Sequence, residues 1–160
     1  MASQRQIGSL VHLRRGGADD LDQVMRIMTA AFEPGFGEAW TRSQCAGILP
    51  MHGVLLTVAE QGGQPAGFSL ARMVADEAEL LLLAVDPAEQ RRGIGQALLD
   101  DFIAGALAAG GHRLHLEVRD GNPAVELYRA SGFSAVGRRR NYYHAPDGQA
   151  FDAVTLMLID

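Results

Sequence analysis

The chain has 160 residues, of which 48% are hydrophobic and 21% charged, a balance that is ordinary for one globular domain with one core. Its formal net charge is -5 and all fourteen basic residues are arginine, which argues against general nucleic-acid binding and excludes Schiff-base lysine chemistry and a Walker-type loop. The apolar runs are too short to span a bilayer, the N-terminal residues carry no secretory pattern, and Cys45 is the only cysteine, so we expect a cytoplasmic protein with no disulfide and no cysteine-based zinc site.

The first elements are a strand and a helix. A strand is predicted over residues 10–14, and a pair of glycines ends it. Asp19 and Asp20 then mark a helix start, because acidic side chains favour the positive end of the helix dipole. Apolar residues recur at helical spacing as far as Phe32.

A Pro-Gly-Phe-Gly stretch at residues 34–37 ends this helix, and a shorter helix is predicted over residues 41–49. Between the two helices lie Phe36 and Trp40. These aromatic side chains either form a lip over a substrate or fold back onto the core, and the sequence leaves both interpretations open.

Two strands, residues 54–60 and 66–74, are predicted as a hairpin because Gln-Gly-Gly-Gln joins them. The next strand covers residues 80–85, six consecutive apolar residues followed by Asp86-Pro87. Such a run is typical of a strand that is buried on both faces.

A Gly-containing loop leads from this strand into a helix that begins near Gly93 or Ile94. Arg91 and Arg92 precede the helix start, where the dipole disfavours cations. Gly93 and Gly95 let a backbone approach a ligand closely, and the first-turn amides have no partner within the helix. The pattern predicts a phosphate cradle, with a solvated basic turn as the alternative.

The remaining chain predicts three strands and one helix. Gly110-Gly111 ends the preceding helix, and residues 114–118 alternate as a strand. Asn122 followed by proline opens a short helix, and residues 134–142 and 151–158 are the last strands. This order is neither regular alternation nor a block of strands, so we expect a three-layer α/β domain around a mixed sheet.

The chain resembles the GCN5-related N-acetyltransferase (GNAT) superfamily. Gln90, Gly93 and Gly95 match the Gln/Arg-x-x-Gly-x-Gly/Ala loop of that superfamily, between a strand and a helix. Its Asn…Leu-Tyr…Gly-Phe block is matched by Asn122, Leu127, Tyr128, Gly132 and Phe133. The resemblance implies one GNAT domain over residues 1–160, with a mixed sheet of about seven strands and about four helices.

Within the superfamily the chain is most similar to the RimI type, whose members acetylate the N-terminal alanine of a small-subunit ribosomal protein. Leu-Glu-Val-Arg at residues 116–119 and Arg-Arg-Asn-Tyr-Tyr at residues 139–143 carry this resemblance. The chain departs from the pattern at Leu82, where Asn is usual, at His115, where Trp is usual, and in the longer segment 34–40. The last departure bears on the acceptor substrate.

The resemblance implies that acetyl-CoA is the cosubstrate and that backbone amides from Arg91 to Gln96 hold its pyrophosphate, with Gln90 and the arginines assisting. The expected cofactor-binding residues lie at the end of the strand, in the loop, in the first helical turn and in the Asn-Tyr block: Leu83, Ala84, Val85, Gln90, Arg91, Arg92, Gly93, Ile94, Gly95, Gln96, Ala97, Asn122 and Tyr128.

An α-amine with a pKa near 8 is about 10% neutral at pH 7, so an enzyme for protein N-termini needs only a mild base. The resemblance points to Glu117 as that base, acting directly or through water. Glu117 could instead merely pair with Arg119 or His115, and Glu79 is the competing base. Tyr128 is the expected general acid, because a phenol remains protonated at pH 7 and can protonate a thiolate.

We therefore expect acetyl transfer by direct attack to the N-terminal α-amine of a protein, which enters between segment 34–40 and the turn after Tyr143. Residues 138–143 mix three arginines with tyrosines and are interpreted as a wall for the peptide. His115 and Glu117 alone do not make a metal site. The rivals are acetylation of a lysine or a small amine, and a non-catalytic acyl-CoA sensor. The expected state is a monomer or weak dimer with no nucleic acid or membrane partner.

Overall fold

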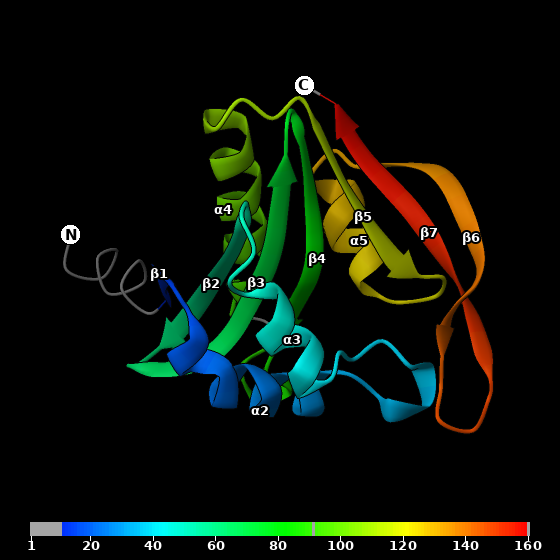
Figure 1. Ribbon diagram of the computed structural model, residues 1–160, viewed down its shortest axis with the longest axis horizontal. Coiled ribbons are helices and arrows are strands. Elements are labelled where there is room, and N and C mark those ends of the chain that lie inside the picture. Colours follow the sequence, from blue (N-terminus) through cyan, green and yellow to red (C-terminus); the bar gives the residue numbers. More distant parts are fainter. Residues whose placement is uncertain (1–10, 91, 160) are drawn as a thin grey trace.

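A computed structural model describes residues 11–90 and 92–159 of the chain (Figure 1). With the labels of Figure 1, its helices are α2 (Leu21–Ala31), α3 (Arg42–Ile48), α4 (Ile94–Ala108) and α5 (Ala124–Ala130). The strands are β1 (Val11–Arg15), β2 (Val54–Gln61), β3 (Gln64–Val74), β4 (Glu77–Val85), β5 (Arg113–Arg119), β6 (Ser134–His144) and β7 (Ala150–Ile159).

The seven strands form one sheet in the order β1-β2-β3-β4-β5-β7-β6. Neighbouring strands are antiparallel except β4 and β5, which are parallel and are joined through α4. Parallel neighbours need such a crossover, because the chain must return to the same end of the sheet. The predicted class, an α/β fold with a mixed seven-stranded sheet and four helices, is confirmed.

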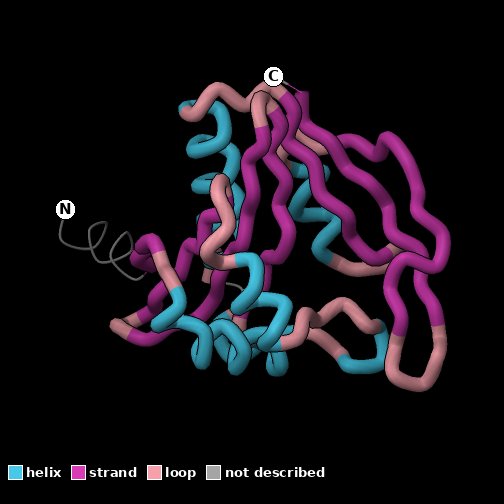
Figure 2. The backbone as a smooth tube through the Cα atoms, in the orientation of Figure 1, coloured by secondary structure: helices cyan, strands magenta, loops and turns pink. Residues whose placement is uncertain are grey.

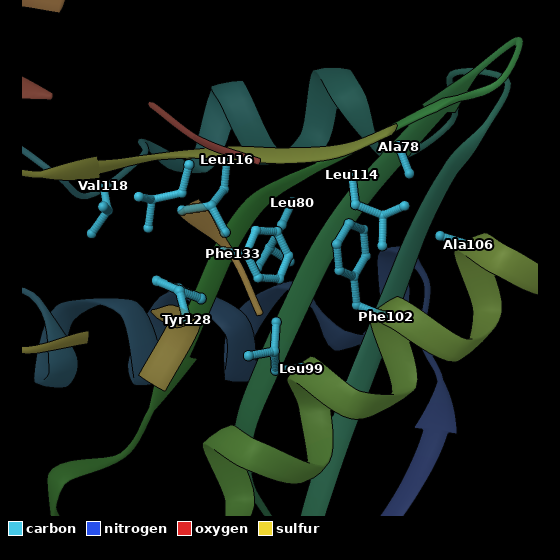
Figure 3. Packing of buried hydrophobic residues seen from close by; sticks show 11 residues of the cluster. Ala78, Leu80, Leu99, Phe102, Ala106, Leu114, Leu116, Val118, Tyr128 and Phe133 are labelled. Atoms are coloured by element: carbon cyan, nitrogen blue, oxygen red, sulfur yellow. The ribbon is translucent and has the colours of Figure 1, made fainter. Parts of the chain in front are cut away.

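The sheet is covered on both faces. Helices α2 and α3 pack Val24, Ile27 and Cys45 against one face, together with buried residues of β2, β3 and β4. Helix α4 and the short α5 cover the other face (Figures 1 and 2). There Phe102 of α4 points toward Leu114 of β5 (Figure 3). This is the three-layer arrangement expected from the order of elements.

Strand β4 changes faces at an extra residue. Leu70 pairs with Leu82 and Ala71 with Leu80, so Leu81 is inserted between the two registers as a bulge. Leu80 therefore packs toward α4 and α5, whereas Leu82, only two residues on, packs toward α2 and α3. The bulge also lies where the pairing of β4 with β5 ends.

The pairing of β4 with β5 stops at Leu80 and Leu116. Beyond this point the β4 edge that faced β5 has no strand partner among the described residues, and the two strands separate as they run toward their carboxyl ends (Figure 1). A backbone edge left open in this way can accept a ligand. The cleft described below lies in this gap.

Several boundaries differ from those predicted. Strand β4 starts at Glu77, three residues earlier than predicted. Its apolar side chains pack into cores on both faces of the sheet, as predicted, with Leu80 on the side of α4 and α5 and Leu82 on the side of α2 and α3. The strand predicted at residues 10–14 is observed as Val11–Arg15, and Leu10 lies outside the described residues. No helix in the described part of the chain is both long and apolar enough to cross a membrane.

Candidate active site

A cleft of about 820 Å³ occupies the gap between β4 and β5. Its walls come from residues 79–85 of β4, residues 116–119 of β5, the N-terminus of α4, helix α5, the segment between α2 and α3, and two tyrosines of β6. Except for Arg92 and Ala97, every described residue among those expected to bind the cofactor lines this cleft. The expected base Glu117 and acid Tyr128 line it as well.

The N-terminus of α4 offers free backbone donors to the cleft. The first amide bonded within the helix is that of Ala97, which donates to Gly93 O at 2.9 Å. The amides of Ile94, Gly95 and Gln96 therefore have no helical partner, and all three residues line the cleft. Gly93 has φ +79°, which only glycine adopts readily. This turn fits an anionic group such as a diphosphate.

The side chains around this turn take different positions. Gln90 lines the cleft, and Arg92 Nε lies 3.5 Å from Glu89 Oε1, outside the lining. The side-chain amide of Gln96 donates to Asp100 and to Ser131 at 2.8 and 3.1 Å, which leaves its backbone amide for a ligand. Arg91, also expected to bind the cofactor, lies outside the described residues.

Leu83, Ala84 and Val85 contribute the β4 wall of the cleft. They follow the point where pairing with β5 ends, so their backbone is the edge available to an extended ligand. Their side chains pack into the cores on either face, Ala84 toward α2 and Leu83 and Val85 toward α4. The expected contact with a cofactor thus falls on the backbone.

Glu117 and Tyr128 approach the cleft from opposite faces of the sheet. Leu80 and Leu116 pack with Tyr128 in the core beneath α4 and α5, and Tyr128 lies at the Val118 end of this cluster (Figure 3). Glu117 follows Leu116, so its side chain points to the other face. A group between the strands therefore meets the carboxylate on one side and the phenol on the other.

The carboxylate of Glu117 is oriented by two neighbours. The hydroxyl of Thr155, on the adjacent β7, donates a hydrogen bond to Oε2, and Arg139 Nε lies 3.3 Å from Oε1. The Glu117 side chain is 9% exposed, whereas that of Arg139 is 60% exposed. Thr155 is thus the inner, fixed contact, and Arg139 is an outer one that solvent screens.

Tyr128 is 6% exposed and packs edge-on against Phe133, with ring centroids 6.2 Å apart. Burial raises the pKa of Tyr128 well above its ordinary value, and the negative charge of Glu38 raises it further. The phenol therefore stays protonated throughout the neutral range, as a proton donor must.

Two more tyrosines and a second carboxylate line the cleft. Tyr143 donates a hydrogen bond to the backbone oxygen of Glu117 at 3.2 Å, and burial is the main cause of its raised pKa. Tyr142 packs edge-on against Tyr143 with ring centroids 4.9 Å apart. Glu79, the competing base, projects from the same face as Glu117, because each neighbours one residue of the Leu80–Leu116 pair.

Asn122 is held inside the protein at both ends of its amide. Its Oδ1 accepts from the Ala124 amide at 2.8 Å, which caps α5, and its Nδ2 donates to Glu38 Oε2 at 2.8 Å. Glu38 in turn lies 3.3 Å from Arg119 Nε. This cluster brings the α2–α3 segment into the cleft wall.

Both interpretations of the α2–α3 segment apply in part. Phe36 and Trp40 are half-buried, Trp40 packs against the core beneath α2, and both line the cleft. The segment reaches across to the β6–β7 turn (Figure 1), where a Cβ on Gly37 would overlap the backbone oxygen of His144. The two segments are in contact there, which closes that point of the expected entrance.

Sequence reasoning did not find Glu38 or Thr155. Glu38 lies in a segment that the sequence marked only as long, and Thr155 is one polar residue in an alternating strand. His115, the other candidate ligand, lies 3.7 Å from Glu77. Among the described residues, no cluster of three or more His, Cys, Asp or Glu could hold a metal ion.

The chain is similar in sequence to known N-acetyltransferases. Over 99 residues the chain is 43% identical to the ribosomal protein bS18-alanine N-acetyltransferase of Escherichia coli. The aligned stretch covers 61% of this chain and 66% of that protein. It is 41% identical over 98 residues to the N-alpha-acetyltransferase RimI of Mycobacterium tuberculosis, covering 58% of this chain and 60% of that one. The matches thus span slightly less than two thirds of these relatives.

The crystal structure of the ribosomal-protein-S18-alanine N-acetyltransferase from Escherichia coli superposes with a TM-score of 0.83 and 34% identity, over 93% of each chain. The sequence profile of the acetyltransferase (GNAT) family matches residues 21–133, which include the glycine turn, Glu117, Tyr128 and every cleft residue except Tyr142 and Tyr143. The chain therefore belongs to the GNAT family of acetyltransferases.

Proposed function

We propose that this chain, as one GNAT domain, transfers an acetyl group from acetyl-CoA to the N-terminal α-amine of a protein, with the N-terminal alanine of a small-subunit ribosomal protein as its acceptor. The observation that carries the proposal is the cleft between β4 and β5, because it combines free helix amides with Glu117 and Tyr128 on opposite sides. The names of the similar proteins support the choice of acceptor.

The residues present fit acetyl-CoA. The amides of Ile94, Gly95 and Gln96 suit the pyrophosphate, and the open edge at residues 81–85 suits an extended pantetheine arm. A Cβ on Gly95 would only make ordinary contacts at 3.6 Å or more, so packing within the protein does not require glycine there. A glycine at that position does keep the approach to the amides open.

Acetyl-CoA supplies the acetyl group as an activated thioester. Glu117 receives the proton of the attacking amine, directly or through one water, and its orientation is fixed by Thr155. Tyr128, on the far side of the cleft, gives its proton to the departing sulfur. Cys45 is buried beneath α2 and does not line this cleft, so the chain offers no thiol for a covalent intermediate.

The acceptor side of the cleft suits a cationic chain end. Four glutamates line the cleft, Glu33, Glu38, Glu79 and Glu117, against one described arginine, Arg119, which is paired with Glu38. The excess of negative charge attracts a protonated amine and a basic peptide. We propose a monomer or weak dimer, since the cleft is complete within one chain.

The proposal is tested by measuring CoA release from acetyl-CoA with a panel of amines: a free peptide beginning Ala-Arg, the same peptide with a blocked N-terminus and an internal lysine, and a polyamine. Only the free peptide should support rapid release. Glu117→Gln should lower this rate, while Glu126→Gln on the exposed face of α5 should not. Preference for lysine or polyamine contradicts the acceptor, and tight acetyl-CoA binding without release from any amine favours a sensor.

A further inference from the structure

The α2–α3 segment carries a carboxylate that takes no part in the proton transfers proposed above. Glu38 lies in the cleft wall with its side chain only 9% exposed, and its partner Arg119 is 11% exposed. A carboxylate that is nine-tenths buried is destabilising unless it is paired and hydrogen-bonded. Each carboxylate oxygen of Glu38 therefore needs a counter-charge or a hydrogen-bond donor.

Glu38 connects three separate elements. Its Oε1 lies 3.3 Å from Arg119 Nε at the end of β5, and its Oε2 accepts from Asn122 Nδ2 at 2.8 Å, at the start of α5. Apart from this pairing, the buried Nε of Arg119 makes no hydrogen bond. Removing the charge of Glu38 would leave the guanidinium without its closest buried counter-charge.

The same segment is fixed at two further points. The Phe36 ring lies under the Arg119 guanidinium, with 3.6 Å between Cζ and the ring centroid, and packs edge-on against Phe151 of β7 at 5.3 Å. Gly37, at φ +68°, lies so close to the His144 backbone that no side chain fits. Together these contacts hold the segment in one position against β5, β7 and the backbone of His144.

We propose that Glu38 is a positioning residue that ties the acceptor wall, residues 34–40, to β5 and α5. This inference rests on the proposed function for its acceptor role. It follows from the contacts of Glu38 with Arg119 and Asn122, since Asn122 also accepts from the Ala124 amide at the start of α5. The acceptor wall is thus coupled to the helix that carries Tyr128.

The test exchanges the hydrogen-bond donor and acceptor between positions 38 and 122. In Glu38→Gln the ionic partner of Arg119 is lost, and in Asn122→Asp the cap on Ala124 is retained but a second carboxylate faces Glu38. Each variant should raise the KM for the peptide about tenfold or more, and Glu38→Gln should change the KM for acetyl-CoA by less than about twofold. In the double variant the new amide at position 38 can donate to the new carboxylate at position 122, so the peptide KM should fall back toward that of the parent.

The matched control is Glu60→Gln. Glu60 also pairs with an arginine, Arg14 Nε at 2.9 Å, and its side chain is 22% exposed, but it lies on β2 outside the cleft lining. This variant should lose stability without a change in either KM. If Glu38 only stabilised the fold, Glu38→Gln would behave like Glu60→Gln: it would lower stability and leave both KM values unchanged.

Hydrogen–deuterium exchange of the free protein separates this inference from the proposed function, since it needs no turnover. Amides in residues 34–40 should exchange faster in Glu38→Gln than in the parent or in Glu60→Gln, and the swap should restore their protection. Unchanged exchange, a KM for acetyl-CoA that rises with the peptide KM in Glu38→Gln, or no recovery in the swap overturns the proposal. A parent that acetylates no peptide overturns the proposed function instead, while the exchange data still decide whether the tie exists.

Discussion

At the residue scale, two side chains of the cleft handle protons in opposite ways. Glu117 has a hydroxyl donor on one oxygen and a screened arginine at the other, and these contacts orient its carboxylate at the cleft. Tyr128 is buried, and burial favours its neutral form. The two environments differ in the sense that a base and an acid require.

The first prediction concerns pH. The peptide α-amine has a pKa near 8, so the rate should rise with pH as it deprotonates and level off above about pH 8. Because burial raises the pKa of Tyr128, the phenol remains protonated and no fall should occur below about pH 10. A rate profile measured with a free alanine peptide checks this, and a descending limb near neutrality would remove Tyr128 as the acid.

Tyr128→Phe provides the companion measurement. The substitution keeps the ring that packs on Phe133 but removes the proton donor. We expect kcat to fall about a hundredfold or more, with acetyl-CoA affinity by calorimetry unchanged. A variant with parental kcat would show that another group, or solvent, protonates the sulfur.

Thr155 gives a further prediction. Thr155→Val removes the hydroxyl that donates to Glu117, and we expect kcat to fall roughly three- to tenfold because the carboxylate loses its fixed orientation. Thr155→Ser keeps the hydroxyl and should retain most of the rate. Equal loss in the two variants would point to packing in β7 and not to the hydrogen bond.

At the element scale, the bulge at Leu81 and the first turn of α4 together shape the part of the cleft in which we propose that acetyl-CoA binds. The bulge separates β4 from β5 after Leu80, and the turn at Gly93 aims three free amides into the opening. The glycine turn could be predicted from the sequence because Gly93 and Gly95 lie between a strand pattern and a helix pattern. The bulge was not, since a run of four leucines looks the same in either register.

Substitution of Gly93 tests the turn, and substitution of Gly105 in the same helix serves as the comparison. Gly93→Ala forces a side chain into φ +79°, which should cost about 1–2 kcal/mol and weaken acetyl-CoA binding. Gly105, in the last turn of α4, has open space where a Cβ would lie and no positive φ, so Gly105→Ala should stabilise the protein by up to about 1 kcal/mol. Urea unfolding and calorimetry measure both, and unchanged acetyl-CoA affinity in Gly93→Ala would contradict the cradle.

At the scale of the whole molecule, the order of elements and the matching motifs were sufficient to predict the layers and the mixed sheet. Periodicity and turn residues carry this information locally. Glu38 and Arg119 could not be paired from the sequence, because they lie far apart in the chain and their contact depends on how the α2–α3 segment crosses the cleft. Side-chain partners across such distances follow from tertiary packing and not from local pattern.

The edge of the sheet offers a prediction about stability. Arg14 of β1 binds Asp20 at 2.8 Å and Glu60 at 2.9 Å, and the hydrogen bond from Arg14 lowers the pKa of Asp20 below its usual value of 3.8. Since the folded pKa is depressed, this contribution to stability is present above about pH 4 and is lost as the pH falls through the folded pKa. Asp20→Asn should therefore be less stable than the parent to urea at pH 7, and the difference should shrink at low pH.

The central claim is transfer of an acetyl group to a protein α-amine, and the most direct measurement uses one peptide that contains both kinds of amine. A peptide that begins Ala-Arg and carries an internal lysine is incubated with the protein and acetyl-CoA, and the modified residue is located by tandem mass spectrometry. We expect one acetyl group on the alanine nitrogen, in the parent but not in Tyr128→Phe over the same short time. Acetyl groups on the lysine, or none on the peptide, would contradict the claim.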